Sequence, residues 1–479
     1  RSHSKDKANS RRGLSMKGVR KATVVGLFAF LNFLNGTDRY AVAGLLQQIS
    51  KYYDISDSEA GLLQTVYIVT YVISAPIFGY MGDRFNRKWV LLGGSLLWIV
   101  FILASSFIPP QVFGVFLLFR AFSGVGDAAV NTLVPSIIGD IYSGKGRSYS
   151  LMVFYYSVPF GWSASVIVAS QIIESNTDWQ WGLRVVPPFA IASIILLAFL
   201  LQEPERREIV IQEHTVWFDF RHILRVKSFL FVTLAVTAMN IVTGAQGWWN
   251  PTMVQLAMNS TANDPTIFHG QSYSLIQSII GIMNTAGGII GTTISVWVAE
   301  LWNSSGLLCL APSSKSVPWV GAASTALAFC STIYVQHFFL IDINWYYVLS
   351  FYGSIMAFGT YALTMNVLLK VIPSSRRAIA TAVFNTFASI FGDAPAPFVV
   401  GKIADALRDY SAPDQDGDHL QALLNASYLS NAFMAVCTLC FVLTVLFIER
   451  DEAAVEETEK RLPSSSSDSS PSRSYSQRM

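Results

Sequence analysis

The stretch Leu31–Leu46 reads LNFLNGTDRYAVAGLL and places an aspartate beside an arginine inside an otherwise apolar helix. An ionisable side chain at bilayer depth costs at least ~2.5 kcal/mol, so Asp38 and Arg39 require a polar cavity and partners on other helices. Adjacent helical residues point about 100° apart, so each is expected to serve a different neighbour. Alternatively, the pair marks a helix end from which both charges reach the headgroups. The apolar residues that continue to Leu46 favour the buried position.

The composition is that of a polytopic membrane protein. Of 479 residues, 52% are hydrophobic and 13% are charged, a balance that excludes a soluble enzyme and a disordered chain. The net charge is only +2, and the basic residues lie in short clusters between apolar segments, not on one face. We therefore expect no nucleic-acid partner. Four cysteines are too few for a disulfide framework, and Cys437-x-x-Cys440 suits helix packing. We expect no catalytic activity, no cofactor and no metal site.

Apolar segments of about 20 residues or more, enough to span a bilayer, form two groups of six. The first group lies at 22–46, 58–81, 89–108, 112–141, 147–174 and 182–202, and the second at 229–257, 272–302, 318–340, 343–371, 377–406 and 420–449. The sequence therefore predicts an all-α membrane protein with twelve transmembrane helices in two six-helix halves. The predicted parts are a basic tail (1–21), an N-terminal half (22–202), a polar linker (203–228), a C-terminal half (229–449) and a disordered serine-rich tail (450–479).

The charges of the loops predict the orientation in the membrane. Basic residues dominate the first tail and the linker, so the positive-inside rule places both in the cytosol. An even number of spans returns the second tail to the same side. The sequon Asn259-Ser260-Thr261 would then face the lumen or the cell exterior, which is weak support. Basic residues of the second, fourth and tenth loops agree with this orientation: Arg84, Arg87, Lys88, Lys145, Arg147, Arg376 and Arg377.

The two halves contain a related stretch. Residues 146–161 read GRSYSLMVFYYSVPFG, and residues 376–392 read RRAIATAVFNTFASIFG. A basic residue, small residues, an aromatic and a glycine recur about 230 positions apart, as in Arg147 and Arg377. Six-helix repeats that face each other across a midplane site are the design of the major facilitator transporters. The duplication therefore resembles theirs.

The second loop reads GDRFNRK over residues 82–88. It is similar to the major facilitator loop signature G-x(0–3)-D-R-x-G-R-[KR], with Asn86 where glycine is common. An aspartate at a helix end can engage a neighbouring helix N-terminus, and the arginines can clamp the cytosolic side, so the loop can stabilise one access state. Alternatively, its basic residues serve topology alone. The gating candidates are Gly82, Asp83, Arg84, Arg87 and Lys88.

The fourth span reads RAFSGVGDAAVNTLVPSIIGD over residues 120–140. Arg120 and Asp127 are seven residues apart, so they share a helical face about 10 Å apart along the axis. Asp127 lies near the depth of Asp38, which permits pairs of Arg39 with Asp127 and of Arg120 with Asp38, or the reverse. A buried carboxylate near a movable arginine can take up and release a proton, so Asp38 and Asp127 are the proton-coupling candidates. The alternative is a static ion network.

Two further spans contain helix-loosening residues. The seventh reads GAQGWWNP over 244–251, and the eleventh reads GDAPAP over 392–397. Glycine and proline at these places favour bends that line a path. We take Trp248, Trp249 and Asp393 as substrate or ion-pair candidates together with Arg39 and Arg120. The two tryptophans could instead belong to an interfacial aromatic belt.

At this point the chain resembles the Spinster family of major facilitator lysolipid transporters. The resemblance rests on the order of NGTDRYAVAGLLQQI, GLLQTVYIVTYVISAPIFGYMGDRFNRK, RAFSGVGDAAVNTLVPSIIGD, DWQWGLRVVP and FGDAPAPFVVGKIADALR. It implies transport of lysophospholipids or sphingosine phosphates, in late endosomes and lysosomes or, in one branch, at the plasma membrane. By position, Asp38, Arg39 and Arg120 match the family's charged residues. Asp127 stands where the family usually has glutamate.

Together, these observations predict a monomeric, multi-pass transporter that moves an amphiphilic lipid by alternating access with coupling to protons. The headgroup would meet Arg39 or Arg120, and the acyl chain would lie along aromatic and methionine side chains or in a lateral gap to the bilayer. Two other classes stay open. One is a major facilitator carrier of a polar solute such as a sugar or an organic anion, and the other is a membrane receptor that does not transport.

Overall fold

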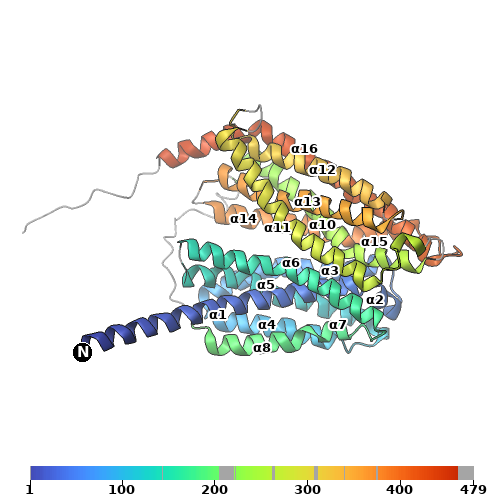
Figure 1. Cartoon of the computed structure of the whole chain (residues 1–479), viewed down its shortest axis with the longest axis horizontal. Coiled ribbons are helices and arrows are strands. Elements are labelled where there is room, and N and C mark those ends of the chain that lie inside the picture. Colours follow the sequence, from blue (N-terminus) through green and yellow to red (C-terminus); the bar gives the residue numbers. More distant parts are fainter. Residues whose placement is uncertain are drawn as a thin grey trace, which may run out of the picture.

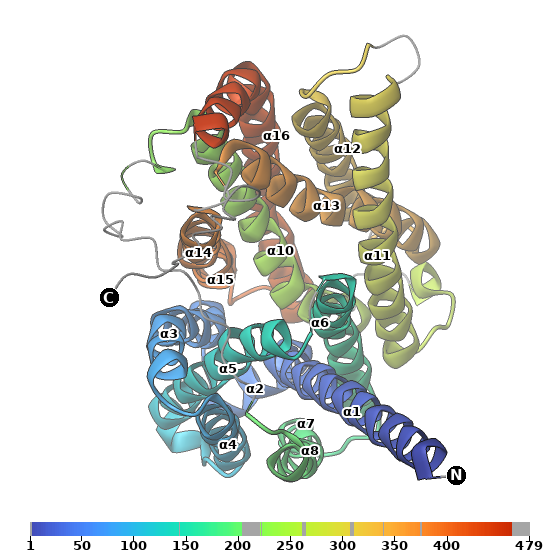
Figure 2. The ribbon, with the colours of Figure 1, turned by 90° about the vertical axis from the view of Figure 1, so that its left-hand side faces the viewer.

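The structure, a computed structural model, describes residues 2–142, 144–203, 221, 223–260, 265–306, 311–338, 340–373 and 376–461. Within these residues the chain is helical and contains no strand. The helices form two groups, which lie one above the other in Figure 1 and are seen end-on in Figure 2.

The N-terminal half contains α1 to α8. Its elements are α1 (Ser2–Gly44), α2 (Leu46–Tyr53), α3 (Asp57–Arg84), α4 (Arg87–Ser105), η1 (Pro110–Val112), α5 (Phe113–Ile141), α6 (Gly144–Glu174), α7 (Trp181–Arg184) and α8 (Val186–Leu200).

The C-terminal half contains α10 to α16. Its elements are α10 (Lys227–Asn259), η2 (Pro265–Phe268), α11 (Tyr273–Ser305), α12 (Ser316–Phe338), α13 (Ile343–Val371), α14 (Arg377–Ala388), the π-helix η4 (Ser389–Asp393), α15 (Pro395–Leu407) and α16 (Gln415–Arg461).

Eleven helices of the described residues are long and apolar enough to cross a membrane. The twelfth expected span is part of α1, which is not among the eleven. Its midsection contains Asn32, Asn35, Asp38 and Arg39, and these polar residues lower its hydropathy. α1 nevertheless packs within the N-terminal half, chiefly along α6.

Several helix boundaries depart from the sequence expectation. α1 begins at Ser2, so most of the predicted basic tail continues the first span as helix. α16 runs to Arg461, so the first part of the predicted disordered tail is helical. The remainder of that tail and most of the predicted linker lie outside the described residues. The eleventh span is α14, η4 and α15 in succession, so its α-helix is interrupted directly before Pro395 and Pro397.

Polar caps fix where several helices begin. Ser56 and Glu59 form a capping box at the start of α3. Asn86 accepts a hydrogen bond from the Trp89 backbone N–H and so caps α4, which gives a local reason for asparagine where the loop signature favours glycine.

We call the end of the bundle where α1 begins and α16 ends the N-terminal face, and the other end the distal face (Figure 1). One hydrophobic cluster, toward the distal face, contains residues of both halves, among them Leu46 and Leu63 with Trp248 and Ala396. Two other clusters belong to one half each and lie toward the N-terminal face. The halves therefore share an apolar core distally and have separate cores toward the N-terminal face.

Candidate transport site

A cavity of about 380 Å³ lies between the halves. The N-terminal half contributes Arg39, Tyr40 and Trp162, and the C-terminal half supplies most of the remaining wall. That wall combines apolar side chains such as Met239 and Phe358 with the carboxamides Asn240, Gln246, Asn250, Asn284 and Gln336. The cavity is therefore amphiphilic.

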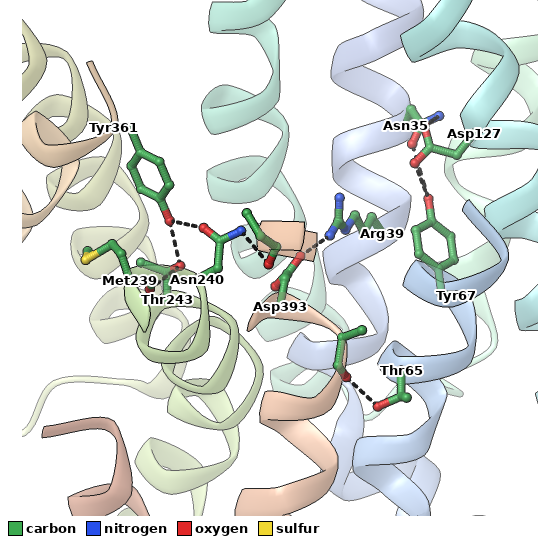
Figure 3. A network of polar contacts seen from close by, with 12 residues as sticks. Asn35, Arg39, Thr65, Tyr67, Asp127, Met239, Asn240, Thr243, Tyr361 and Asp393 are labelled. Carbon is green, nitrogen blue, oxygen red and sulfur yellow. Dashed lines mark hydrogen bonds and ion pairs between the residues drawn. The ribbon is translucent and has the colours of Figure 1, made fainter. Parts of the chain in front are cut away.

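Arg39 of α1 and Asp393 of η4 join the halves inside this cavity (Figure 3). Their side chains form an ion pair with Nη2 and Oδ2 2.7 Å apart, and each is 21% exposed. The π-helix sets the position of Asp393, as such insertions do at many functional sites. Gly244 leaves room for it, since a Cβ atom there would lie 2.7 Å from Asp393 Oδ1. Arg39 thus pairs with Asp393 and not with Asp127, the pairing proposed from sequence.

Asp38 lies behind the cavity, in the core of the N-terminal half. Arg120 Nη1 is 3.8 Å from Asp38 Oδ2, and both side chains are essentially buried. Trp98 Nε1 donates to the same carboxylate oxygen at 2.8 Å. The Arg120 guanidinium also lies over the ring of Tyr67, 5.0 Å from its centroid. The predicted pair of Arg120 and Asp38 is therefore present.

Neutral donors surround Asp127. Asn35 and Asn131 each donate a side-chain N–H to Oδ1 at 2.6 Å. The Tyr67 hydroxyl donates to Oδ2 at 2.9 Å, and Figure 3 shows Asn35 and Tyr67 beside the carboxylate. The side chain of Asp127 is buried. Sequence reasoning missed these three donors. Asn35 was visible as a second polar residue in the Leu31–Leu46 stretch, and Asn131 lies one helical turn after Asp127.

The charges of this region do not balance when all are ionised. Three carboxylates, Asp38, Asp127 and Asp393, accompany two guanidinium groups, Arg39 and Arg120. An uncompensated charge in a low-dielectric interior is costly. A single proton shared among the carboxylates would neutralise the cluster.

A second polar group lies on the C-terminal half of the cavity wall. The Tyr361 hydroxyl donates to Asn240 Oδ1 at 2.9 Å and is 2.9 Å from the Thr243 hydroxyl. The Asn240 amide donates to the Ala388 carbonyl, next to η4, at 3.2 Å. Figure 3 shows this network on one side of Asp393 and Arg39 on the other.

Trp248 and Trp249 are 1% exposed and lie in the shared distal core. Trp249 Nε1 donates to the Pro397 carbonyl at 3.0 Å. Neither residue lines the cavity, and neither belongs to an interfacial belt. Trp249 therefore joins α10 to α15, and Trp248 is buried in the same core. In this conformation neither faces the cavity, and a substrate contact for them stays a prediction.

The loop of residues 82–88 joins helices of one half. Arg87 pairs with Asp140 at 2.7 Å and with Glu203 at 3.1 Å. The Lys88 backbone N–H donates to the second Glu203 oxygen at 3.0 Å, and the Arg84 guanidinium lies over Tyr80. Arg87 therefore ties the start of α4 to the ends of α5 and α8.

Other polar contacts cross between the halves nearer the distal face. Asp57, at the start of α3, lies 2.7 Å from the His419 ring, at the start of α16. The Thr65 hydroxyl donates to the Ala394 carbonyl at 2.6 Å. The Ser163 hydroxyl donates to the Gly281 carbonyl at 2.5 Å. These bonds reinforce the shared apolar core.

Comparison with known proteins places this arrangement in a family. The Major Facilitator Superfamily model matches residues 28–397. Protein spinster homolog 3 of Danio rerio is 31% identical over 457 residues, which cover 92% of this chain and 88% of that protein. The chain belongs to the Spinster family of the Major Facilitator Superfamily. It is thus a multi-pass integral membrane protein of a transporter superfamily.

Further relatives of this Spinster chain include human Protein spinster homolog 1, 32% identical with 90% of this chain and 82% of that protein covered. The sphingosine-1-phosphate transporter SPNS2 of Xenopus tropicalis is 31% identical, with 91% and 83% covered. A bacterial homologue of the human lysosomal transporter Spinster, solved in an inward-facing, occupied conformation, has the same fold. It aligns with a TM-score of 0.74 at 14% identity, with 90% of this chain and 98% of that chain covered.

Proposed function

We propose that this Spinster chain transports a single-chain amphiphilic lipid, a lysophospholipid or a sphingosine phosphate, by alternating access. The observation that carries the proposal is the Arg39–Asp393 pair, which faces a cavity with both apolar and carboxamide walls. A phosphate group can replace the Asp393 carboxylate at the Arg39 guanidinium, because guanidinium groups bind both oxyanions well. The apolar wall accommodates an acyl chain.

Substrate binding would also loosen the contact between the halves. Arg39 belongs to α1 and Asp393 to η4, so a headgroup that binds Arg39 breaks an ion pair between the two halves. The binding free energy of the headgroup at Arg39 then compensates for the loss of the Arg39–Asp393 ion pair. Such an exchange couples occupancy of the cavity to the change of access.

Proton coupling is the second part of the proposal, with Asp127 as the carrier. A carboxylate with no guanidinium in contact holds a proton more readily than one that is paired with a guanidinium, and the hydrogen-bond donors to Asp127 are all neutral. Asp38 is the alternative carrier. Both acids accept hydrogen bonds from neutral donors, but Asp38 also has the Arg120 guanidinium 3.8 Å away, which favours its ionised form more strongly.

The test is flux through purified protein in liposomes with a pH gradient. We expect uptake of labelled lysophosphatidylcholine or sphingosine-1-phosphate, and loss of that uptake in Arg39→Gln. A polar solute, such as a sugar or an organic anion, is the second candidate because carboxamides line the cavity. Flux of the polar solute without lipid flux would replace the proposal. Saturable lipid binding without any flux would indicate a receptor.

For location we propose the late endosomal or lysosomal membrane, with the plasma membrane as the alternative, and a monomeric protein. A lysosomal location is supported by the bacterial homologue, which is described as a homologue of a human lysosomal transporter. Imaging of the tagged protein with organelle markers tests it. Lipidomics of organelles from cells lacking the protein would show which lysolipid accumulates in the organelle, and therefore the direction of transport.

A further inference from the structure

The start of α3 receives a carboxylate from the other half of the molecule. Asp405, near the end of α15, accepts the backbone N–H of Asp57 at 2.9 Å and that of Ser58 at 2.8 Å. The Ser58 hydroxyl donates to it as well, at 2.6 Å. Gly401, one turn earlier, permits this approach, since a Cβ atom there would lie 3.0 Å from the Ser58 nitrogen.

The start of α11 receives the same kind of contact. Glu174, the last residue of α6, accepts the Ser274 backbone N–H at 2.8 Å and the Ser274 hydroxyl at 2.6 Å. Here the acceptor belongs to the N-terminal half and the donor to the C-terminal half. The direction is therefore the reverse of that at α3.

These two contacts occupy equivalent places in the duplicated fold. α6 and the α14–α15 segment carry the related stretches 146–161 and 376–392. Each has an acidic residue at or near its end, Glu174 or Asp405, that accepts hydrogen bonds from the second residue of a helix, and that second residue is a serine both times. Each of these serines lies two positions after the N-cap, which is also a serine. The N-cap is Ser56 in α3 and Ser272 in α11.

The physics of a helix start makes such contacts dependent on conformation. The first N–H groups of a helix have no partner within it, and the helix dipole adds partial positive charge there. A carboxylate satisfies both, but each of these carboxylates is attached to the opposite half. When the halves separate at the distal face, both contacts must break, and water replaces them.

We infer that Glu174 and Asp405 are a symmetry-related pair of gate residues that hold the distal face closed. Asp405 has the larger effect, because it accepts three hydrogen bonds and is partly buried, whereas Glu174 accepts two and is exposed. In each half, an acid thus regulates a helix of the other half. The two contacts make distal opening a concerted event.

The experiment measures how often the distal face opens, so it does not depend on the identity of the substrate. A cysteine replaces Thr243 in the cavity wall of a cysteine-free protein, and a membrane-impermeant maleimide is supplied from the distal side of sealed, oriented vesicles. We expect labelling to rise about tenfold in Asp405→Asn and about threefold in Glu174→Gln. The tenfold factor corresponds roughly to the loss of a partly buried, charged hydrogen bond, and the threefold factor to the loss of an exposed one. The double variant should approach the product.

Glu59→Gln is the matched control. Glu59 also caps the start of α3, but it bonds to Ser56 within the same half, so labelling should stay at the wild-type level. A rise in this control equal to that of Asp405→Asn would attribute the effect to fraying of α3 and overturn the inference. Wild-type labelling in folded Asp405→Asn and Glu174→Gln would overturn it as well.

Two further variants cover the case in which Asp405→Asn does not fold. Ser58→Ala and Ser274→Ala remove the hydroxyl donors but keep the backbone N–H groups, and each should raise labelling about twofold. Spin labels on the starts of α3 and α16 measure the distal distance between the halves independently. An unchanged distance distribution in both serine variants and in Glu174→Gln would contradict the gate.

Discussion

At the scale of single residues, three intramembrane carboxylates differ in what surrounds them. Asp393 has a guanidinium partner and faces the cavity, Asp38 has one and is buried, and Asp127 has neutral donors. Under the proposed function, these surroundings assign Asp393 to substrate exchange and Asp127 to proton binding. The predictions at this scale concern Asp127 and Asp393.

Replacement of Asp127 by asparagine imitates the protonated acid permanently. We expect lysolipid binding to survive and pH-dependent uptake to disappear, because the side chain keeps its shape but cannot release a proton. Asp127→Glu, the usual family residue, should retain part of the transport. Uptake and folded yield are measured together across a pH gradient. Full pH-dependent transport by Asp127→Asn would exclude this carrier and leave Asp38.

Replacement of Asp393 by asparagine removes the carboxylate that competes with a lipid phosphate for the Arg39 guanidinium. We expect the affinity for a lipid phosphate to rise about three- to tenfold, because the headgroup no longer displaces a carboxylate, while turnover falls since product release is slower. Equilibrium binding and the kcat for flux are the measurements. Thr332→Ala is the control, because Thr332 lines the same cavity and its hydroxyl donates to a carbonyl of its own helix, that of Phe329. Weaker binding by Asp393→Asn would show that Asp393 itself helps to hold the substrate.

At the scale of helices, the loop of residues 82–88 acts within one half. Its buried arginine joins the start of α4 to α5 and α8 through two carboxylates. The ends of three helices are thereby held together at the N-terminal face. Under the proposed alternating access, we expect this half to move as one body.

Arg87→Gln should destabilise the N-terminal half. Removal of the cation leaves Asp140 and Glu203 without their ion pair, and the loss of one partner of a buried pair costs about 3–5 kcal/mol. We expect about 2–4 kcal/mol here because both acids are partly exposed. Thermal unfolding in detergent measures the change. Arg84→Gln, whose guanidinium lies over Tyr80, should change stability by less than about 1 kcal/mol.

At the scale of the whole molecule, the two halves share a core distally and have separate cores toward the N-terminal face. α3 packs against α15 and α6 against α11. Glycines allow the closest of these approaches. A substitution at such a glycine therefore tests the movement of the halves and not only their stability.

Gly61→Ala should hinder closure of the distal face. A Cβ atom there would lie 2.6 Å from the Pro397 carbonyl carbon and 2.7 Å from the Phe398 Cα atom, both on the backbone of α15. We expect slower transport and more frequent opening on the distal side, seen as labelling of the cavity cysteine. Gly93→Ala is the matched control, since nothing lies within 4 Å of its added Cβ atom. Equal transport by both variants would contradict a tight distal crossing.

The orientation of the molecule in the membrane is a separate prediction. Both tails and the linker of residues 203–228 should face the cytosol, because basic residues cluster in the first tail and in the linker. A cysteine in place of Glu213 should react with an impermeant reagent only after the membrane is permeabilised. Reaction in intact cells or organelles would reverse the topology.

The sequence by itself determined the class of the protein and most of its spans. Apolar length, loop charge and proline positions are local properties, so the spans, the halves and the interruption of the eleventh helix could be predicted without a structure. The same holds for Asp38, Arg39, Arg120, Asp127 and Asp393 as candidates. A charge in an apolar helix is conspicuous because its burial is costly.

Only the tertiary structure decided which groups meet. Arg39 finds Asp393, 354 positions away, and not Asp127, because pairing depends on the rotation and tilt of helices from both halves. The burial of Trp248 and Trp249, the donors around Asp127 and the caps at Ser58 and Ser274 follow from the same packing. Sequence spacing specifies the depth of a residue along its own helix. It does not specify which neighbouring helix that residue faces.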